Sequence, residues 1–159
     1  MEFIVLVGVD NTGKTTTLKK VVKDLVTKGA SIVNDPRFHK FGSYVSSLSQ
    51  LTGSLKNEIT ILLKYKDRLI GITTYGDVES VIKNKIDIFV DVGCPHIICA
   101  SHPKGSSSYT YLESTARKNS ASLIEVAKIG CKGDKKDAKY GKVCEFADRL
   151  AADEIISYI

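Results

Sequence analysis

Eight residues close to the amino terminus have the types and spacing of a phosphate-binding loop. The stretch reads Gly8-Val9-Asp10-Asn11-Thr12-Gly13-Lys14-Thr15 and fits the pattern Gly-x4-Gly-Lys-Ser/Thr. Gly8 and Gly13 allow backbone dihedral angles that a Cβ atom resists, so successive N–H groups can turn inward and form a nest for an anion. The helix predicted to follow adds the positive end of its dipole. The alternative, a glycine-rich surface turn, does not explain why both a strand and a helix flank the motif.

Lys14 and Thr15 supply the two side chains that a bound triphosphate requires. A lysine at this position reaches the β- and γ-phosphates as a mobile point charge, and a threonine hydroxyl is a hard oxygen ligand for Mg²⁺. We therefore expect ATP and Mg²⁺ as cofactors, with Lys14 in a catalytic role. The residues expected to bind the nucleotide are Gly8, Asp10, Asn11, Thr12, Gly13, Lys14, Thr15 and Thr16.

Length, charge and cysteine spacing limit the class of protein. A chain of 159 residues predicts a single domain over residues 1–159. The formal net charge of +5 suits a nucleotide ligand but is too small and dispersed to indicate nucleic acid. The four cysteines lack the spacing of a structural zinc site. Without a leader-like segment or an apolar run long enough for a bilayer, we expect a cytoplasmic protein with no membrane contact.

Strand and helix signals alternate along the chain. An apolar strand over 2–8 leads into the glycine-rich motif, and an amphipathic helix over 16–28 follows it. Further strands are predicted over 30–33, 68–73, 96–100 and 122–127, with helices over 77–93, 109–118 and 146–156. This alternation predicts an α/β domain with the three-layer P-loop fold, in which a mostly parallel sheet has helices on both faces.

Two segments have more than one interpretation. Residues 58–65 alternate apolar and polar side chains and are followed by a tight connection at Lys66-Asp67, which predicts an antiparallel hairpin with 68–73. A helix over 56–65 is the competing interpretation. Residues 39–53 fit either a short helix or a covering loop.

Phosphoryl transfer also needs a carboxylate that orients the metal and a cation over the transferred group. Asp77 follows a predicted strand and is the first candidate for metal binding and catalysis, although an N-cap role explains it equally well. Asp35 and Arg37 are candidates for substrate binding, against a turn-forming aspartate and a solvated arginine. Lys104 is the candidate catalytic cation, in a loop over 101–108 that is able to close as a lid.

The glycine-rich motif resembles the phosphate loop of thymidylate kinase and other nucleoside-monophosphate kinases of the P-loop class. The residues that carry the resemblance are Gly8, Asp10, Gly13, Lys14, Thr15 and Thr16. In that family the acidic residue helps to place the acceptor nucleotide, so the resemblance implies that Asp10 acts in catalysis and in substrate binding. Asn34-Asp35-Pro36-Arg37 is similar to the family's Arg-Glu-Pro element. The pattern over 70–77 also resembles small uncharacterised ATP-binding P-loop proteins of bacteria and phages.

Two classes of function follow from these features. The first is a kinase that transfers the γ-phosphate of ATP to a small acceptor, for which the resemblance implies a nucleotide or nucleoside. The second is an NTP-hydrolysing or NTP-sensing switch, in which residues 35–53 and 74–77 contact a protein partner and change order with the γ-phosphate. Asp10 favours the kinase. The loop after His102 has Lys104 but none of the family's lid arginines, which favours the switch.

Overall fold

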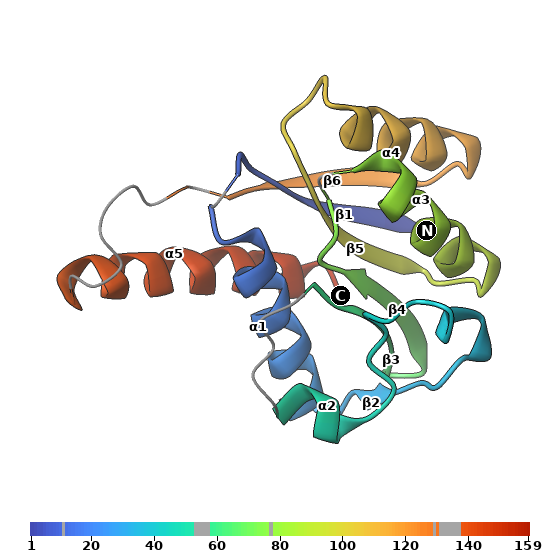
Figure 1. Ribbon diagram of the computed structural model, residues 1–159, viewed down its shortest axis with the longest axis horizontal. Coiled ribbons are helices and arrows are strands. Elements are labelled where there is room, and N and C mark those ends of the chain that lie inside the picture. Colours follow the sequence, from blue (N-terminus) through green and yellow to red (C-terminus); the bar gives the residue numbers. More distant parts are fainter. Residues whose placement is uncertain (11, 53–57, 77, 129, 131–137) are drawn as a thin grey trace.

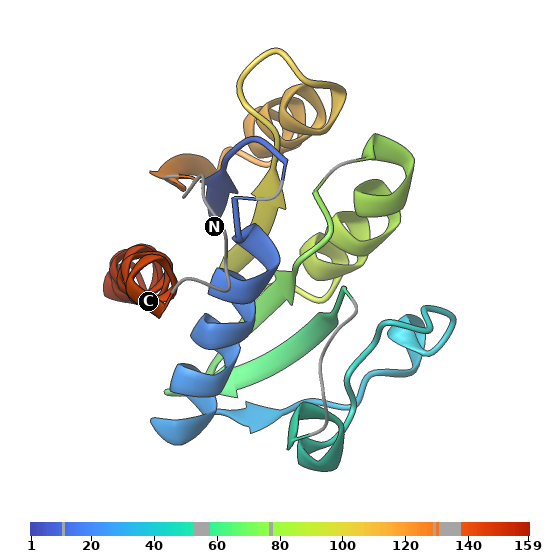
Figure 2. The same cartoon turned by 60° about the vertical axis from the view of Figure 1, so that its left-hand side comes forward.

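A six-stranded sheet lies between two layers of helices (Figure 1). The computed structural model describes residues 1–159 except 11, 53–57, 77, 129 and 131–137. The helices α1 (Lys14–Thr27) and α5 (Ala138–Ser157) cover one face of the sheet, and α3 (Glu79–Asp91) and α4 (Ser107–Lys118) cover the other (Figure 2). The predicted α/β architecture of three layers is confirmed.

Most of the sheet is parallel, as predicted. Its strands are β1 (Glu2–Val7), β2 (Ser31–Ile32), β3 (Thr60–Tyr65), β4 (Arg68–Thr73), β5 (His96–Ser101) and β6 (Ser122–Ala127). The order across the sheet is β2-β3-β4-β5-β1-β6. β1, β4, β5 and β6 run in one direction, and β3 is antiparallel to both of its neighbours.

The predicted hairpin of β3 and β4 is confirmed. Lys66 and Asp67 have φ angles of 47° and 62°, which are the left-handed conformations of a two-residue turn whose twist matches the strands that it joins. Ile61 and Leu63 pack on the side of α1, whereas Leu62 packs on the side of α3. Residues 60–65 therefore form a strand rather than part of a helix, because their apolar side chains are divided between two faces.

Several helix boundaries differ from the predicted ones, most of all in α5, which begins at Ala138 rather than at residue 146. α1 begins two residues early, at Lys14. α4 also begins two residues early, because the Ser106 hydroxyl accepts a hydrogen bond from the Tyr109 N–H at 3.2 Å and caps the helix. The segment over 39–53 contains both an irregular stretch and a short helix, α2 (Leu48–Thr52). A 3₁₀ turn, η1 (Pro36–Phe38), precedes it.

Two apolar cores hold the helices to the sheet. β1 contributes to both, with Ile4 and Leu6 packed toward α1 and α5, and Phe3 and Val5 packed toward α3 and α4. A central strand that is buried on both faces explains the uninterrupted apolar sequence at this position. Within the described ranges, none of the helices has the length and apolar character required to cross a membrane.

The sheet topology predicts a ligand-binding crevice between β1 and β5. The chain leaves β1 for α1 on one face of the sheet and leaves β5 for α4 on the opposite face. Ligands of parallel sheets bind outside the carboxyl ends of strands whose connections diverge in this way. The glycine loop (residues 8–15) and the loop over 102–106 flank this crevice, so the predicted phosphate-binding motif lies where the topology favours binding.

His96 is a buried titratable residue at the start of β5. It is 6% exposed, its Nδ1 atom lies 3.1 Å from Glu2 Oε2, and its Nε2 atom has no hydrogen-bond partner among the described residues. Burial lowers the pKa of His96, and the Glu2 carboxylate opposes part of that effect. As the pH falls below the usual histidine pKa, the unfolded chain therefore binds a proton more readily than the folded protein does.

We predict that the free energy of unfolding decreases as the pH falls below about 6.5, because protonation of His96 favours the unfolded chain. His96→Leu should remove this contribution, since leucine carries no proton. Thermal unfolding at about pH 5.5 and about pH 7.5 measures the effect, and His39→Gln, at an exposed histidine, is the matched control. If wild type and His96→Leu lost the same Tm between the two pH values, His96 would not be the source.

Candidate functional site

The glycine loop closes tightly between β1 and α1. Gly13 has a φ angle of 87°, a left-handed conformation that favours glycine, directly before the first residue of α1. A Cβ atom on Gly8 would lie 2.8 Å from the Thr12 hydroxyl oxygen and 3.2 Å from the Lys128 Cβ atom. Larger residues at these two positions would strain or displace the loop, which presents the amino end of α1 to the crevice.

The Lys14 side chain is folded into this loop. Its ammonium group donates hydrogen bonds to the carbonyl oxygens of Gly8, at 2.7 Å, and Val9, at 2.9 Å, and the residue is 8% exposed. The Thr12 hydroxyl donates to the same Val9 carbonyl at 2.9 Å. A full positive charge is therefore held beside the amino end of a helix, where both favour an anionic ligand.

Glu58 connects the glycine loop to the β3–β4 hairpin. Its Oε1 atom accepts a hydrogen bond from the Thr15 hydroxyl at 2.8 Å, and its Oε2 atom accepts one from the Thr74 hydroxyl. Thr74 is fixed in turn, because its hydroxyl oxygen accepts a hydrogen bond from the Ile59 N–H at 2.8 Å. Both oxygens of the carboxylate are thus oriented by threonines from different elements. One is Thr15, the expected Mg²⁺ ligand in the first turn of α1, and the other is Thr74, which follows β4.

Glu58 was not among the predicted site residues. Its sequence position predicted only the start of a hairpin strand. The predicted hairpin nevertheless indicated where Glu58 would lie. In an antiparallel hairpin, the first residues of the first strand lie beside the last residues of the second. Because β4 is parallel to β5, this places Glu58 at the carboxyl edge of the sheet, beside the glycine loop.

An ion pair from α5 supports the loop from the opposite side. Lys128 follows β6, and its ammonium group lies 2.7 Å from Asp148 Oδ1, with the lysine side chain 1% exposed. The same carboxylate oxygen accepts a hydrogen bond from the Thr17 hydroxyl at 3.1 Å, and it would lie 3.1 Å from a Cβ atom on Gly13. Asp148 therefore ties α5, β6 and the first turns of α1 together directly behind the loop.

Asp10, another predicted nucleotide-binding residue, lies at the solvent side of the crevice. Asp10 has a 74% exposed side chain, and its Oδ1 atom lies 3.4 Å from His102 Nε2, across the mouth between β1 and β5. Thr16 and Lys104 are exposed. The predicted loop over 101–108 is shorter than expected, because Ser101 ends β5 and α4 begins at Ser107. Its irregular part is limited to residues 102–106.

Asp35 and Arg37 pair with each other rather than with the glycine loop. Arg37 Nε donates to Asp35 Oδ1 at 2.9 Å, and Arg37 Nη2 donates to Asp35 Oδ2 at 2.6 Å. Hydrogen bonding from Arg37 lowers the pKa of Asp35. Asp91, at the carboxyl end of α3, also acts electrostatically on Arg37. Since α3 starts at the carboxyl edge of the sheet and ends at its amino edge, this pair lies away from the crevice.

A hollow of about 470 Å³ adjoins Glu58. It is lined by Lys40, Phe41, Gly42, Ser43, Glu58, Tyr75 and Lys85. The Lys85 ammonium lies 4.7 Å from the centroid of the Phe41 ring and 4.2 Å from that of Tyr75. Burial lowers the pKa of Lys85. Among the described residues, two lysines and one carboxylate line the hollow, and none of these three was predicted to belong to the site.

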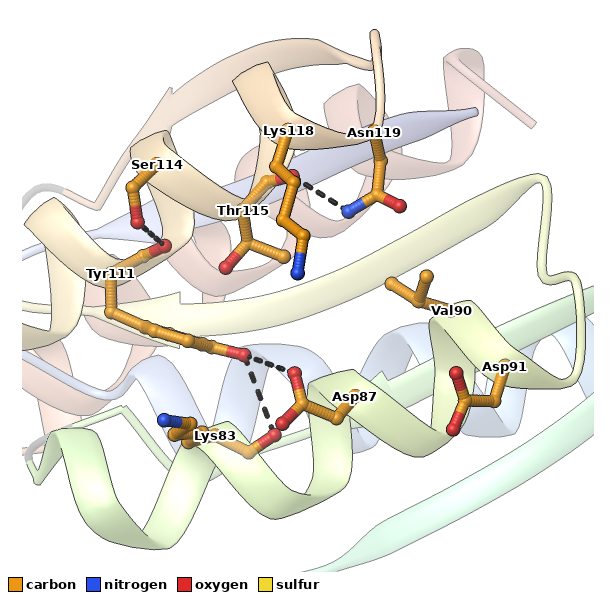
Figure 3. Close-up of a pocket in the computed structure, with 9 residues that line it drawn as sticks. All are labelled: Lys83, Asp87, Val90, Asp91, Tyr111, Ser114, Thr115, Lys118 and Asn119. Carbon is orange, nitrogen blue, oxygen red and sulfur yellow. Dashed lines mark hydrogen bonds between the residues drawn. The ribbon is translucent and has the colours of Figure 1, made fainter.

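A second hollow, of about 640 Å³, lies between α3 and α4 on the outer surface (Figure 3). Its charged side chains, Lys83, Asp87, Asp91 and Lys118, are exposed. The Tyr111 hydroxyl donates to Asp87 Oδ1 at 2.7 Å across the groove. None of the predicted site residues that the structure describes lines this groove.

Two predicted site residues, Asn11 and Asp77, lie outside the described residues, so their roles stay predictions. Among the described residues, no group of three or more His, Cys, Asp or Glu side chains is placed to hold a metal ion. Proteins commonly bind Mg²⁺ through one or two side chains together with substrate phosphates and waters. Thr15 and Glu58 are the pair that fits this arrangement.

No family model, curated protein or solved structure matches this chain. The fold brings Lys14, Thr15 and Glu58 together at the carboxyl edge of the sheet, with Asp10 beside the crevice and Asp148 behind the loop.

We predict that Asp148→Ala lowers the free energy of unfolding by about 3 kcal/mol, the scale for removing one partner of a buried ion pair. The change removes the carboxylate from Lys128 and the acceptor from Thr17. Urea denaturation measures the loss, and Asp153→Ala, at an exposed carboxylate of the same helix, is the control. A loss no larger than that of the control would show that the pair does not hold α5 in place.

Proposed function

We propose that the protein is an ATP-dependent phosphotransferase that moves the γ-phosphate of ATP to a small acceptor. The observation that carries this proposal is the position of Glu58. Its carboxylate accepts a hydrogen bond from Thr15 and also lines the adjoining hollow. One side chain therefore connects the expected metal-binding hydroxyl to a space that is able to receive an acceptor.

The glycine loop suits the phosphates of a nucleotide in both shape and charge. A Cβ atom on Gly8 would meet the Thr12 side chain of the loop, and a Cβ atom on Gly13 would meet the Asp148 carboxylate behind it. The first N–H groups of α1 are free of intrahelical partners, as at any helix start, and favour an anion. In this proposal Lys14 exchanges its hydrogen bonds to the Gly8 and Val9 carbonyls for phosphate oxygens, which needs only a rotation of its side chain.

Thr15 and Glu58 fit the magnesium ion that accompanies ATP. The Thr15 hydroxyl would be a direct ligand, and Glu58 would orient that hydroxyl and accept hydrogen bonds from metal-bound water. When bound, Mg²⁺ neutralises charge that develops on the transferred group. Glu58 thus joins Asp77 as a candidate for the carboxylate that organises the metal.

The hydrogen bonds of Glu58 also bear on the alternative, an NTP-hydrolysing or NTP-sensing switch. Thr74 follows β4 directly and shares Glu58 with Thr15. If nucleotide binding moved the Thr15 side chain, the hydrogen bonds through Glu58 would therefore transmit that movement to residues 74–76. In the switch alternative, these residues belong to the segment that contacts a protein partner. The hollow favours phosphotransfer, because a switch that hydrolyses NTP needs only water as the acceptor.

Turnover of γ-labelled ATP in the presence of small hydroxylated acceptors tests the proposal. Nucleosides, nucleoside monophosphates and small hydroxy acids serve as acceptors, and water alone is the control. We expect at least one acceptor to raise ATP consumption above the rate in water and to become labelled. If ATP were consumed at the water rate with every acceptor, the switch would replace the phosphotransferase.

We predict that Glu58→Gln keeps MgATP binding and lowers turnover about a hundredfold, the upper scale for residues that orient a metal ligand. Glutamine keeps an oxygen for the Thr15 hydroxyl but removes the negative charge beside the metal. Calorimetry measures binding, and an ATPase or transfer assay measures turnover on the same preparation. Glu79→Gln, at an exposed glutamate in the first turn of α3, is the control. Near-wild-type turnover in Glu58→Gln would return the metal-organising role to Asp77.

A further inference from the structure

We propose that the acceptor is a small aliphatic hydroxy acid, bound in the hollow with its anionic group at Lys40 and Lys85 and its hydroxyl toward Thr15. This inference rests on the proposed phosphotransfer. It differs from the nucleotide or nucleoside acceptor that the sequence resemblance implies. The juxtaposition that supports it is a pair of lysines at one part of the hollow and the Thr15–Glu58 contact at another.

The two lysines give the hollow its affinity for an anion. Lys85 is 4% exposed, and its ammonium group donates to the Val81 carbonyl at 2.9 Å. Its ammonium group also contacts the faces of Phe41 and Tyr75, and among the described residues it has no ion pair with a carboxylate. A buried ammonium in such surroundings gains strongly from an anionic ligand, because a charge-assisted hydrogen bond then compensates for its lost hydration. Lys40 adds a second, exposed ammonium beside the Phe41 ring, 5.3 Å from its centroid.

The aromatic rings of the hollow already bind these cations. The Phe41 ring contacts both ammonium groups, and the Tyr75 ring contacts that of Lys85. Nucleobases are commonly recognised by stacking on aromatic faces. Here stacking would displace a lysine that is held between two rings. The hollow is therefore better suited to a compact anion than to a base.

The carboxylate of Glu58 sets the orientation of the acceptor. An anionic group next to Glu58 would be repelled, whereas the same group next to Lys40 and Lys85 would be attracted. Both Glu58 oxygens accept hydrogen bonds from threonines, and one of these threonines is Thr15. The uncharged, hydroxyl-bearing end of the acceptor consequently faces the part of the hollow that adjoins the glycine loop.

The transfer step balances without another reactant. The acceptor hydroxyl oxygen forms a bond to the γ-phosphorus of ATP, and the bond from that phosphorus to the β–γ bridging oxygen breaks. ADP leaves with the electron pair, and the hydroxyl proton passes to water. Positioning and charge neutralisation supply most of the catalysis in such a reaction. Lys40 and Lys85 would position the acceptor and would not contact the transferred group.

Binding to the nucleotide-free protein tests the hollow separately from catalysis. The probes are D-glycerate and glycerol 3-phosphate, with glycerol as the neutral counterpart of both and AMP as the nucleotide. We expect the two anions to shift the NMR resonances of residues 40–43 and Tyr75, and glycerol to leave them unchanged.

Lys40→Met and Lys85→Met should each weaken glycerate binding at least about tenfold, because each removes a charge-assisted hydrogen bond. Lys83→Met, at an exposed lysine of α3 outside the hollow, should bind normally.

Lys85→Met also removes cation–π contacts, so its melting temperature is measured alongside. Lys40→Met removes the second positive charge of the hollow at an exposed residue, where loss of the contact with the Phe41 ring should cost little stability. The inference is overturned if neither anion binds, if glycerol binds as well as glycerate, or if AMP binds the hollow more tightly than both anions. Anion binding in the hollow together with no affinity for MgATP would instead reject the proposed phosphotransferase and leave the anion site standing.

Discussion

The hydrogen bond from Thr15 to Glu58 joins two parts of the chain that the sheet topology otherwise keeps separate. Thr15 belongs to the loop and helix that follow the central strand β1, whereas Glu58 precedes the antiparallel strand β3. A carboxylate reaches the carboxyl edge of the sheet here because the hairpin reverses the chain direction. Without that reversal, residue 58 would lie at the amino edge, far from any bound phosphate.

The glycine loop is thus held from two directions. On one side Glu58 fixes Thr15, and Thr74 fixes Glu58. On the other side Asp148 contacts Thr17 and the buried ammonium of Lys128, so α5 braces the start of α1. Preorganised groups in a phosphate site do not have to be reoriented at the moment of reaction, which is the main way that proteins stabilise phosphoryl transfer.

Local sequence signals predicted the layers of the fold and the glycine loop, but not the full site. Gly8 and Gly13 at fixed spacing, and an apolar β1, specify a loop and a central strand from neighbouring residues alone. The contacts of Asp148 and Lys85 depend instead on how distant helices pack, and neither residue belongs to a local motif. Asp35 and Arg37 were expected at the ligand edge because they follow a strand, yet their mutual ion pair and η1 direct them toward the end of α3.

The central claim is that the glycine loop binds a nucleoside triphosphate with Mg²⁺, and calorimetric titration of MgATP into wild type and Lys14→Ala tests it most directly. Lys23→Ala, at an exposed lysine of α1, controls for the loss of one positive charge. The account predicts saturable binding to wild type and to the control, and an affinity at least about tenfold lower in Lys14→Ala, because the lost interaction is a charge-assisted one. Equal MgATP affinity in all three proteins, or no binding to wild type, would contradict it.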